Sequence, residues 1–280
     1  MGLVLHPLMS FLHRLFRHTA AGTKTDWVFL LPSLVLLAFF GLPLLALIQR
    51  AVGTDFFAYA LSSQALTALR LSLVTSTHSV LLAVALGMPL AYVLARLKFR
   101  GKTALELLVD LLVVLPPSVA GLALLMTFGR TGLFGKGLAL VGVSLPFTTA
   151  AVVLAQTFVS SPLFVRSTRV GFTEIDPRLE EAAWVEGGNE WQVFRFVMFP
   201  LAGHGLVTGV ILAWTRALGE FGATILFARN LEGKTQTMPL AIYLGFERGL
   251  GVALALSVLL VVVSVVLLRV MLKVEKHGGQ

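Results

Sequence analysis

The stretch LGVALALSVLLVVVSVVLLRVML, residues 250–272, carries a single charged side chain, Arg269, in an otherwise almost wholly apolar run. A helix needs roughly 20 mostly apolar residues to cross the hydrocarbon of a bilayer, so this run is long enough to span a membrane. Similar runs precede it, and together they predict an all-α integral membrane protein of about six transmembrane helices: Trp27–Gln49, Ala65–Ala95, Leu105–Phe128, Phe147–Val165, Leu201–Ala228 and Leu250–Leu272.

The composition supports a membrane protein. Hydrophobic residues make up 57% of the chain and charged residues only 13%, whereas soluble domains carry about 25% charged residues. The net charge of +8 comes from cations spread between the apolar runs, so they form no basic face of the kind that binds nucleic acid. The chain has no cysteine, which excludes disulfides, thiolate metal sites and cysteine nucleophiles.

The positions of Lys and Arg predict the orientation, because cytoplasmic connections of membrane proteins are enriched in these residues. Most of them lie in the N-terminal tail, after the second run, in the connection 166–199 and at the C-terminal end. Both termini are therefore predicted to be cytoplasmic. Residues 1–26 form an N-terminal tail without the unbroken apolar core of a signal peptide, residues 27–272 one membrane domain, and residues 273–280 a C-terminal tail.

The connection 166–199 has the pattern of two short helices. Asp176 suits the capping position of the first helix and Pro177 its first turn, and Gly187 marks its end. Asn189 then suits the cap of a second helix, with Gln192 as its capping-box partner. Pro200 marks entry into the fifth span. A helix–glycine–helix unit of this kind could dock into a groove on another protein.

This connection resembles the EAA loop of ABC importer permeases. The matching residues are Glu181-Ala182-Ala183, Gly187 after three residues, and Val197-Met198-Phe199-Pro200 after a further nine. Val197 and Phe199 replace the Ile and Leu of the family pattern, and both changes keep an apolar side chain. The resemblance implies a type I ABC importer permease fold in which Glu181, Ala182, Ala183, Gly187 and Pro200 belong to the loop that inserts into a cytoplasmic ATPase subunit.

Further segments resemble molybdate permeases. Leu115–Gly121 (LPPSVAG) is similar to their third span, Arg216–Thr224 (RALGEFGAT) to their fifth span, and Thr235–Tyr243 (TQTMPLAIY) to the following external stretch. Sulfate and tungstate permeases share parts of the second segment, so it indicates oxyanion importers in general. The third segment favours molybdate, and sulfate or tungstate remains the alternative.

The chain lacks a nucleotide-binding loop of its own. Two Gly-Lys-Thr triplets occur, at 101–103 and 233–235, but Arg96 and Ala228 stand where the phosphate-binding loop requires a glycine. We therefore expect no cofactor in this chain, and ATP and Mg to be bound by a partner ATPase. No motif of a hydrolase or metalloenzyme indicates an enzyme.

Two ionisable residues fall inside the fifth span. A charge in the bilayer centre costs at least about 2.5–3.5 kcal/mol, so such residues face protein or water. Arg216 and Glu220 are four residues apart and would share a helix face, which Thr208 and Thr224 extend. Four glycines would permit close helix approach: Gly205, Gly209, Gly219 and Gly222. Two interpretations are open: a translocation pathway in which Arg216 accommodates an anion, or a structural ion pair.

The resemblance further implies a homodimer with the pathway at its interface, in the prokaryotic cytoplasmic (inner) membrane. Its expected partners are cytoplasmic ABC ATPase subunits and an extracytoplasmic oxyanion-binding protein, with the lipid bilayer around it. ATP-driven alternating access would then transport the oxyanion. The alternative from another class is an ATP-independent secondary transporter or channel, which would need broken helices in paired halves; the sequence shows no such pairing.

Overall fold

The computed structural model describes residues 24–278, and that part of the chain is helical throughout its regular structure. It divides into two units, Met1–Arg50 and Ala51–Gln280. The described part of the first unit is most of helix α2 (Lys24–Val52), which contains Pro32 and Pro43. Residues Val28–Val52 of this helix are apolar enough to cross a membrane. The tail 1–26 lies almost wholly outside the described residues.

Four helices of the described chain are long and apolar enough to span a bilayer, and the number reaches the predicted six if each of two bent helix pairs forms one span. The long helices are α2, α4 (Ser63–Arg96), α8 (Thr149–Thr173) and α15 (Leu250–Gly278). One bent pair is α5 (Lys102–Val114) with α6 (Pro117–Phe128). The other joins residues Glu190–Leu201 to α12 (Gly203–Leu218). The remaining helices are short: α3 (Phe56–Ala60), α7 (Gly135–Leu140), α9 (Pro177–Val185), α10 (Glu190–Val193), η1 (Phe194–Met198), α11 (Phe199–Leu201), α13 (Gly222–Phe227) and α14 (Met238–Arg248).

The predicted third span, Leu105–Phe128, is wrong as a continuous helix. Helices α5 and α6 meet at an angle of 116° around Leu115 and Pro116. The cause is local, because a residue before proline is pushed out of the helical region and proline itself supplies no N–H. Leu115 and Pro116 indeed have extended backbones, with ψ of 128° and 133°.

The predicted fourth and fifth spans also need correction. Helix α8 runs on to Thr173, eight residues beyond the predicted end at Val165. Its start at Thr149 is fixed by Thr148, whose hydroxyl accepts a hydrogen bond from the N–H of Ala151 at 3.2 Å. The predicted fifth span, Leu201–Ala228, is interrupted: α12 ends at Leu218, and α13 begins only at Gly222.

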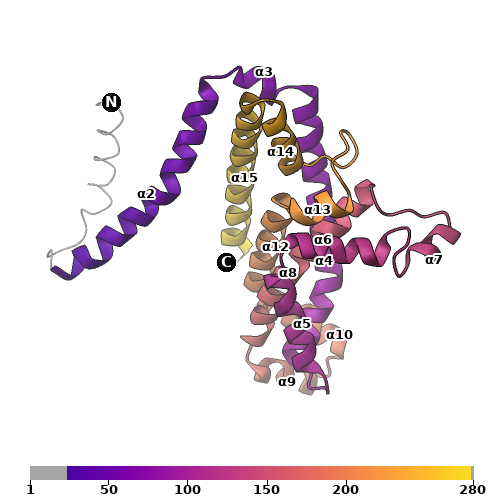
Figure 1. Cartoon of the computed structure of the whole chain (residues 1–280). Coiled ribbons are helices and arrows are strands. Elements are labelled where there is room, and N and C mark those ends of the chain that lie inside the picture. The colour runs from indigo at the N-terminus through magenta and orange to yellow at the C-terminus, as the bar shows by residue number, and fades with distance from the viewer. Residues whose placement is uncertain (1–23, 279–280) are drawn as a thin grey trace. The chain divides into compact units, whose positions relative to one another are not determined.

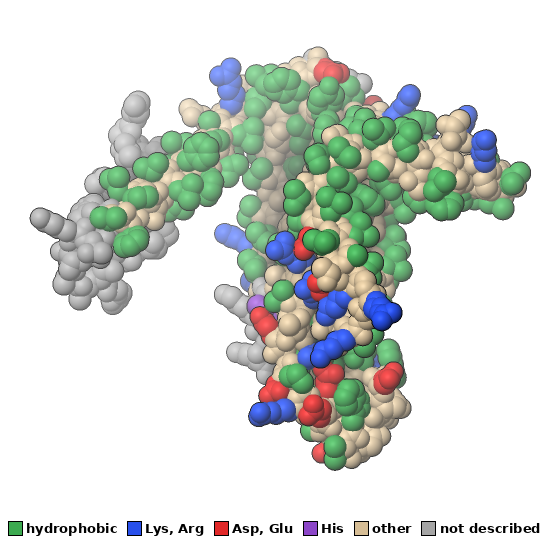
Figure 2. All heavy atoms as spheres, turned by 60° about the horizontal axis from the view of Figure 1, so that its bottom comes forward, with side chains coloured by type: hydrophobic (Ala, Val, Ile, Leu, Met, Phe, Trp, Pro, Cys, Tyr) green, Lys and Arg blue, Asp and Glu red, His purple; other side chains and the backbone are tan. Residues whose placement is uncertain are grey.

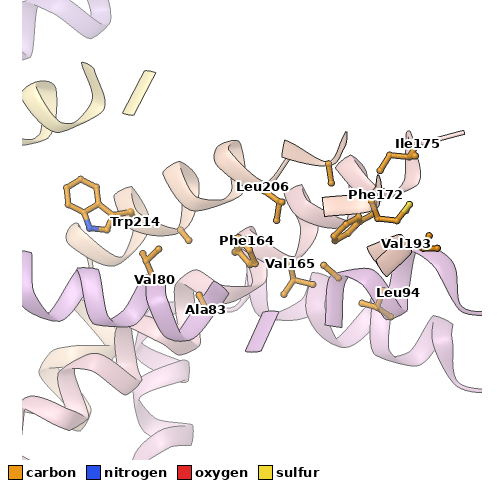
Figure 3. Packing of buried hydrophobic residues seen from close by; sticks show 14 of the residues in the cluster. Val80, Ala83, Leu94, Phe164, Val165, Phe172, Ile175, Val193, Leu206 and Trp214 are labelled. Atoms are coloured by element: carbon orange, nitrogen blue, oxygen red, sulfur yellow. The ribbon is translucent and has the colours of Figure 1, made fainter. Parts of the chain in front are cut away.

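The largest buried cluster lies between α4, α8 and α12 and continues into the segment around α9 and η1 (Figure 3). Phe164, Phe172 and Met198 are fully buried in it. We call the end of Ala51–Gln280 that carries α9 and α10 the loop end; α3 and α14 lie at the opposite end (Figure 1). Charged side chains gather at the loop end. Apolar side chains cover most of the helices between the two ends, which we call the shaft (Figure 2).

Helices α8 and α12 cross at two glycines. A Cβ atom on Gly205 would lie 2.7 Å from the Cα of Gly171, a separation that no side chain tolerates. The hydroxyl of Ser167 also donates a hydrogen bond to the carbonyl of Gly205 at 3.0 Å. Close backbone approach of this kind is typical of helix pairs in membranes, and it holds the fifth span against the fourth.

Candidate functional site

The connection between α8 and α12 begins with helix α9. Asp176 caps it, because its carboxylate accepts a hydrogen bond from the N–H of Arg178 at 3.0 Å, and Pro177 occupies the first turn, as predicted. The helix ends at Val185, and Gly187 adopts φ of +90° in the turn that follows. A left-handed backbone is accessible to glycine at little cost, so this glycine lets the chain reverse direction.

The second helix of the connection has the predicted capping box. The side chain of Asn189 accepts a hydrogen bond from the N–H of Gln192, and the side chain of Gln192 accepts one from the N–H of Asn189, both at 2.9 Å. Helix α10 does not stop there but continues through the π-helical turn η1 and α11.

Pro200 does not mark the start of the fifth span. It lies inside α11, and α12 begins at Gly203 after a bend of 70°. Within a helix, the ring of Pro200 crowds the carbonyl of residue 196. A π-helical turn, Phe194–Met198, ends two residues before this proline.

The residues that carry the EAA resemblance divide between two environments. Glu181, Ala182 and Gly187 are exposed, whereas Ala183 is half-buried against the large cluster. Val185 is 88% exposed and Trp184 is 49% exposed beside them. Exposed apolar side chains grouped in this way are typical of a surface that binds a partner. Pro200 is exposed as well, but it lies on a different helix.

Glu180 is the buried residue of helix α9. It is 6% exposed, and its Oε1 lies 2.8 Å from Nε of Arg96 at the end of α4. Arg96 also donates from Nη2 to the carbonyl of Ile175 at 2.8 Å. Glu180 stands three residues before Ala183 and so shares its helix face, a signal that could have predicted its burial.

Arg216 and Glu220 form the predicted pair, with Nη1 2.5 Å from Oε2. Glu220 lies outside α12, in the interruption before α13, and its Oε1 accepts a hydrogen bond from the N–H of Ala223 at 2.7 Å. The carboxylate is 1% exposed and the arginine side chain 30%. Thr224 is fully buried. The continuous helical stripe from Arg216 to Thr224 is therefore wrong, because the helix breaks between them.

The glycines predicted to permit close packing mostly do so. A Cβ on Gly209 would lie 3.1 Å from Phe164 side-chain and backbone atoms, and one on Gly222 would lie 2.9 Å from Pro117. Gly222 thereby brings the start of α13 against the start of α6, so the two interrupted spans meet at their breaks. The sequence did not predict that these two interruptions lie beside one another.

The chain belongs to a known family of membrane transport subunits. Residues 83–277 match the family model described as binding-protein-dependent transport system inner membrane component. This family comprises the permeases of ABC transporters, so the protein is a multi-pass inner-membrane permease and not the catalytic subunit. The family assignment confirms the predicted class of protein and excludes the alternative of an ATP-independent transporter. It also implies two partners for this chain, a separate ATPase and a binding protein.

Particular relatives are similar over most of their length. The chain is 44% identical over 238 residues to the molybdenum transport system permease protein ModB of Mycobacterium tuberculosis, covering 85% of this chain and 90% of that protein. It is 37% identical over 210 residues to the probable sulfate transport system permease protein cysT of Chlorokybus atmophyticus, covering 74% and 73%. A bacterial ABC transporter that imports alginate has the same fold, with a TM-score of 0.76, 19% identity and coverage of 91% and 96%.

Proposed function

We propose that this chain is the permease of an ATP-driven importer for a tetrahedral oxyanion, and that the oxyanion is molybdate. The choice of molybdate rests on one observation. The chain is 44% identical to a permease named for molybdenum transport, and the match covers 90% of that permease. Similarity to a permease named for sulfate transport is lower in both identity and coverage. Sulfate is therefore the second candidate, with tungstate, which has the same shape and charge as molybdate.

The surface formed by Glu181, Ala182, Trp184 and Val185 is proposed to dock into the ATPase, and we call it the docking face. Three properties support this role: its side chains are exposed, it lies on a short capped helix outside the apolar shaft, and it carries the EAA pattern. The loop end would then be cytoplasmic, in agreement with the charged side chains that gather there (Figure 2). With six spans, both termini would be cytoplasmic too.

We infer that Arg216 and Glu220 hold α12 to α13 rather than bind the transported anion. Glu220 neutralises Arg216 and also accepts a hydrogen bond from the N–H of Ala223 in the first turn of α13. An incoming dianion would have to displace a buried carboxylate that already makes both contacts. Thr224 is fully buried within one copy, so it does not line a pathway unless the helices move apart.

Two copies of the chain would enclose the pathway, as in the expected homodimer. An extracytoplasmic oxyanion-binding protein would deliver the anion at the end opposite the docking face. ATP and Mg bound by the ATPase subunits would drive the docking faces together and open the pathway outward, and hydrolysis would reset it. The residues directly after the two interruptions, Pro117 and Gly222, lie against each other, and the interruptions at Leu115–Pro116 and Gly219–Phe221 are the proposed positions at which the spans bend.

Copurification with the ATPase tests the docking face. A tagged permease carrying Val185→Asp, which places a charge in the proposed apolar contact, should retain less ATPase by about tenfold or more, as expected when a charge is buried at an interface. The matched control is Val141→Asp. Val141 is also strongly exposed, at 72%, but it follows α7 and is not part of the docking face on α9. Equal ATPase retention by Val185→Asp and the parent chain would contradict the proposal.

A further inference from the structure

Helix α4 is attached at its two ends to two segments that are far apart in the sequence. Its last residue, Arg96, contacts α9, and its N-terminal half contacts the first residue of α14 and the stretch before it. We propose that the Arg96–Glu180 ion pair is a positioning contact that makes α4 move with the docking face and pass that movement to the opposite end of the bundle. This inference rests on the proposed docking role of α9.

At the loop end, α4 is held by more than one contact. Besides its ion pair with Glu180, Arg96 donates a hydrogen bond to the carbonyl of Ile175, directly before α9. One turn earlier, the ring of Tyr92 packs edge-on against Phe172 and Phe194, at centroid distances of 5.5 and 5.2 Å. The segments on both sides of α9 therefore rest on the same end of α4, which Figure 3 shows around Leu94 and Val193.

At the opposite end, the hydroxyl of Ser72 accepts a hydrogen bond from the N–H of Met238 at 2.7 Å, and both residues are fully buried. Gln64 donates from its side-chain amide to Gln236 at 3.0 Å. These contacts fix the stretch before α14 to the first turns of α4. A shift of α4 along or about its axis would therefore reach the segment 236–238.

Between its ends, α4 is packed tightly enough to transmit such a shift. Ser79 lies 3.4 Å from Ser160 and accepts a hydrogen bond from Thr157 at 3.2 Å. A Cβ on Gly87 would lie 2.9 Å from the ring of Phe164. Close-packed interiors have low compressibility, so α4 and α8 behave as one body. Ser79 thus serves contact between α4 and α8.

Stability alone does not explain the ion pair. Both side chains are largely buried, at 13% and 9% exposure, and a buried pair is often no more stabilising than apolar residues of the same volume. The contact is also an ion pair by distance rather than a well-directed hydrogen bond, since Nε of Arg96 and Oε1 of Glu180 have no hydrogen-bond partner among the described residues.

Spin labels test the common movement, because the chain has no cysteine of its own. Labels at Leu97→Cys, at the end of α4, and Arg178→Cys, in α9, would be read by double electron–electron resonance in an assembled transporter in which only one of the two copies carries labels, so that only the distance within that copy is measured. The inference predicts the same distance distribution without nucleotide and with ATP trapped. A distribution that shifts between these states would overturn it.

Transport measurements test the pair itself. Glu180→Gln should leave ATPase copurification unchanged, because the docking face is intact, but should lower oxyanion uptake per ATP hydrolysed by about tenfold, within the range by which intermediate residues modulate coupling. Glu174→Gln, an exposed glutamate just before α9, should leave this ratio unchanged. An unchanged ratio in Glu180→Gln would overturn the inference, whereas an ATPase that never binds the parent chain would instead refute the proposed docking function. If Glu180→Gln does not fold, the spin-label distances still decide.

Discussion

Arg216 and Glu220 meet across the point where the fifth span breaks: Nη1 of Arg216 lies 2.5 Å from Oε2 of Glu220, which has left the helix that carries Arg216. The other carboxylate oxygen of Glu220 accepts a hydrogen bond from the N–H of Ala223. The pair therefore joins the end of α12 to the start of α13. Because Glu220 is 1% exposed and Arg216 30%, the two partners are not equivalent.

This asymmetry predicts unequal effects of neutralising each partner. Arg216→Met leaves a buried carboxylate without its cation and should destabilise the protein by about 3 kcal/mol or more. Glu220→Gln keeps an oxygen that can accept from Ala223, and the arginine that remains is partly exposed, so the loss should be smaller. Thermal unfolding in detergent measures both, and the double variant should recover part of the stability lost in Arg216→Met. The reverse order would contradict a capping role for Glu220.

The crossing of α8 and α12 predicts a steric effect at Gly205. Gly205→Ala places a methyl group against Gly171, where the backbone leaves no room, and overpacking of this kind costs about 1–3 kcal/mol. Gly203→Ala on the same helix is the matched control, because its Cβ would meet nothing within 4 Å. Unfolding curves should show a loss for Gly205→Ala alone. Equal curves for the two variants would show that the crossing is looser than described.

The turn after α9 predicts a conformational effect at Gly187. Its φ of +90° lies in the left-handed region, and no atom would approach an added Cβ, so only backbone strain opposes a substitution. The strain is roughly 1–2 kcal/mol for most residues and least for asparagine. Gly187→Val should weaken ATPase copurification, and Gly187→Asn should largely preserve it. If both variants bind the ATPase as the parent does, the turn does not position the docking face.

Local signals in the sequence predicted the elements that depend on neighbouring residues. The apolar runs predicted the four long helices and the regions of the two bent pairs because the length of a span is set by the bilayer. The caps at Asp176 and Asn189 formed as expected because they involve only the next few residues. The two prolines at 116 and 117 contained the signal for the bend between α5 and α6, but apolar content alone predicted one continuous helix.

Contacts between distant segments could not be predicted in the same way. The pairing of Arg96 with Glu180 joins residues on α4 and α9, and a single sequence does not show which cation reaches a buried carboxylate. The break after Leu218 likewise depends on the hydrogen bond that Glu220 accepts from the N–H of Ala223. The spacing of the residues alone favours an unbroken helix there. The EAA resemblance located the docking loop, but it pointed to Glu181 and not to its buried neighbour.

The most direct test of the central claim is uptake by proteoliposomes that contain this permease, its ATPase and the oxyanion-binding protein. The account predicts that labelled molybdate accumulates only when ATP is supplied on the side of the docking face and the binding protein is supplied on the other. Molybdate uptake that continues without the ATPase or without ATP would contradict it.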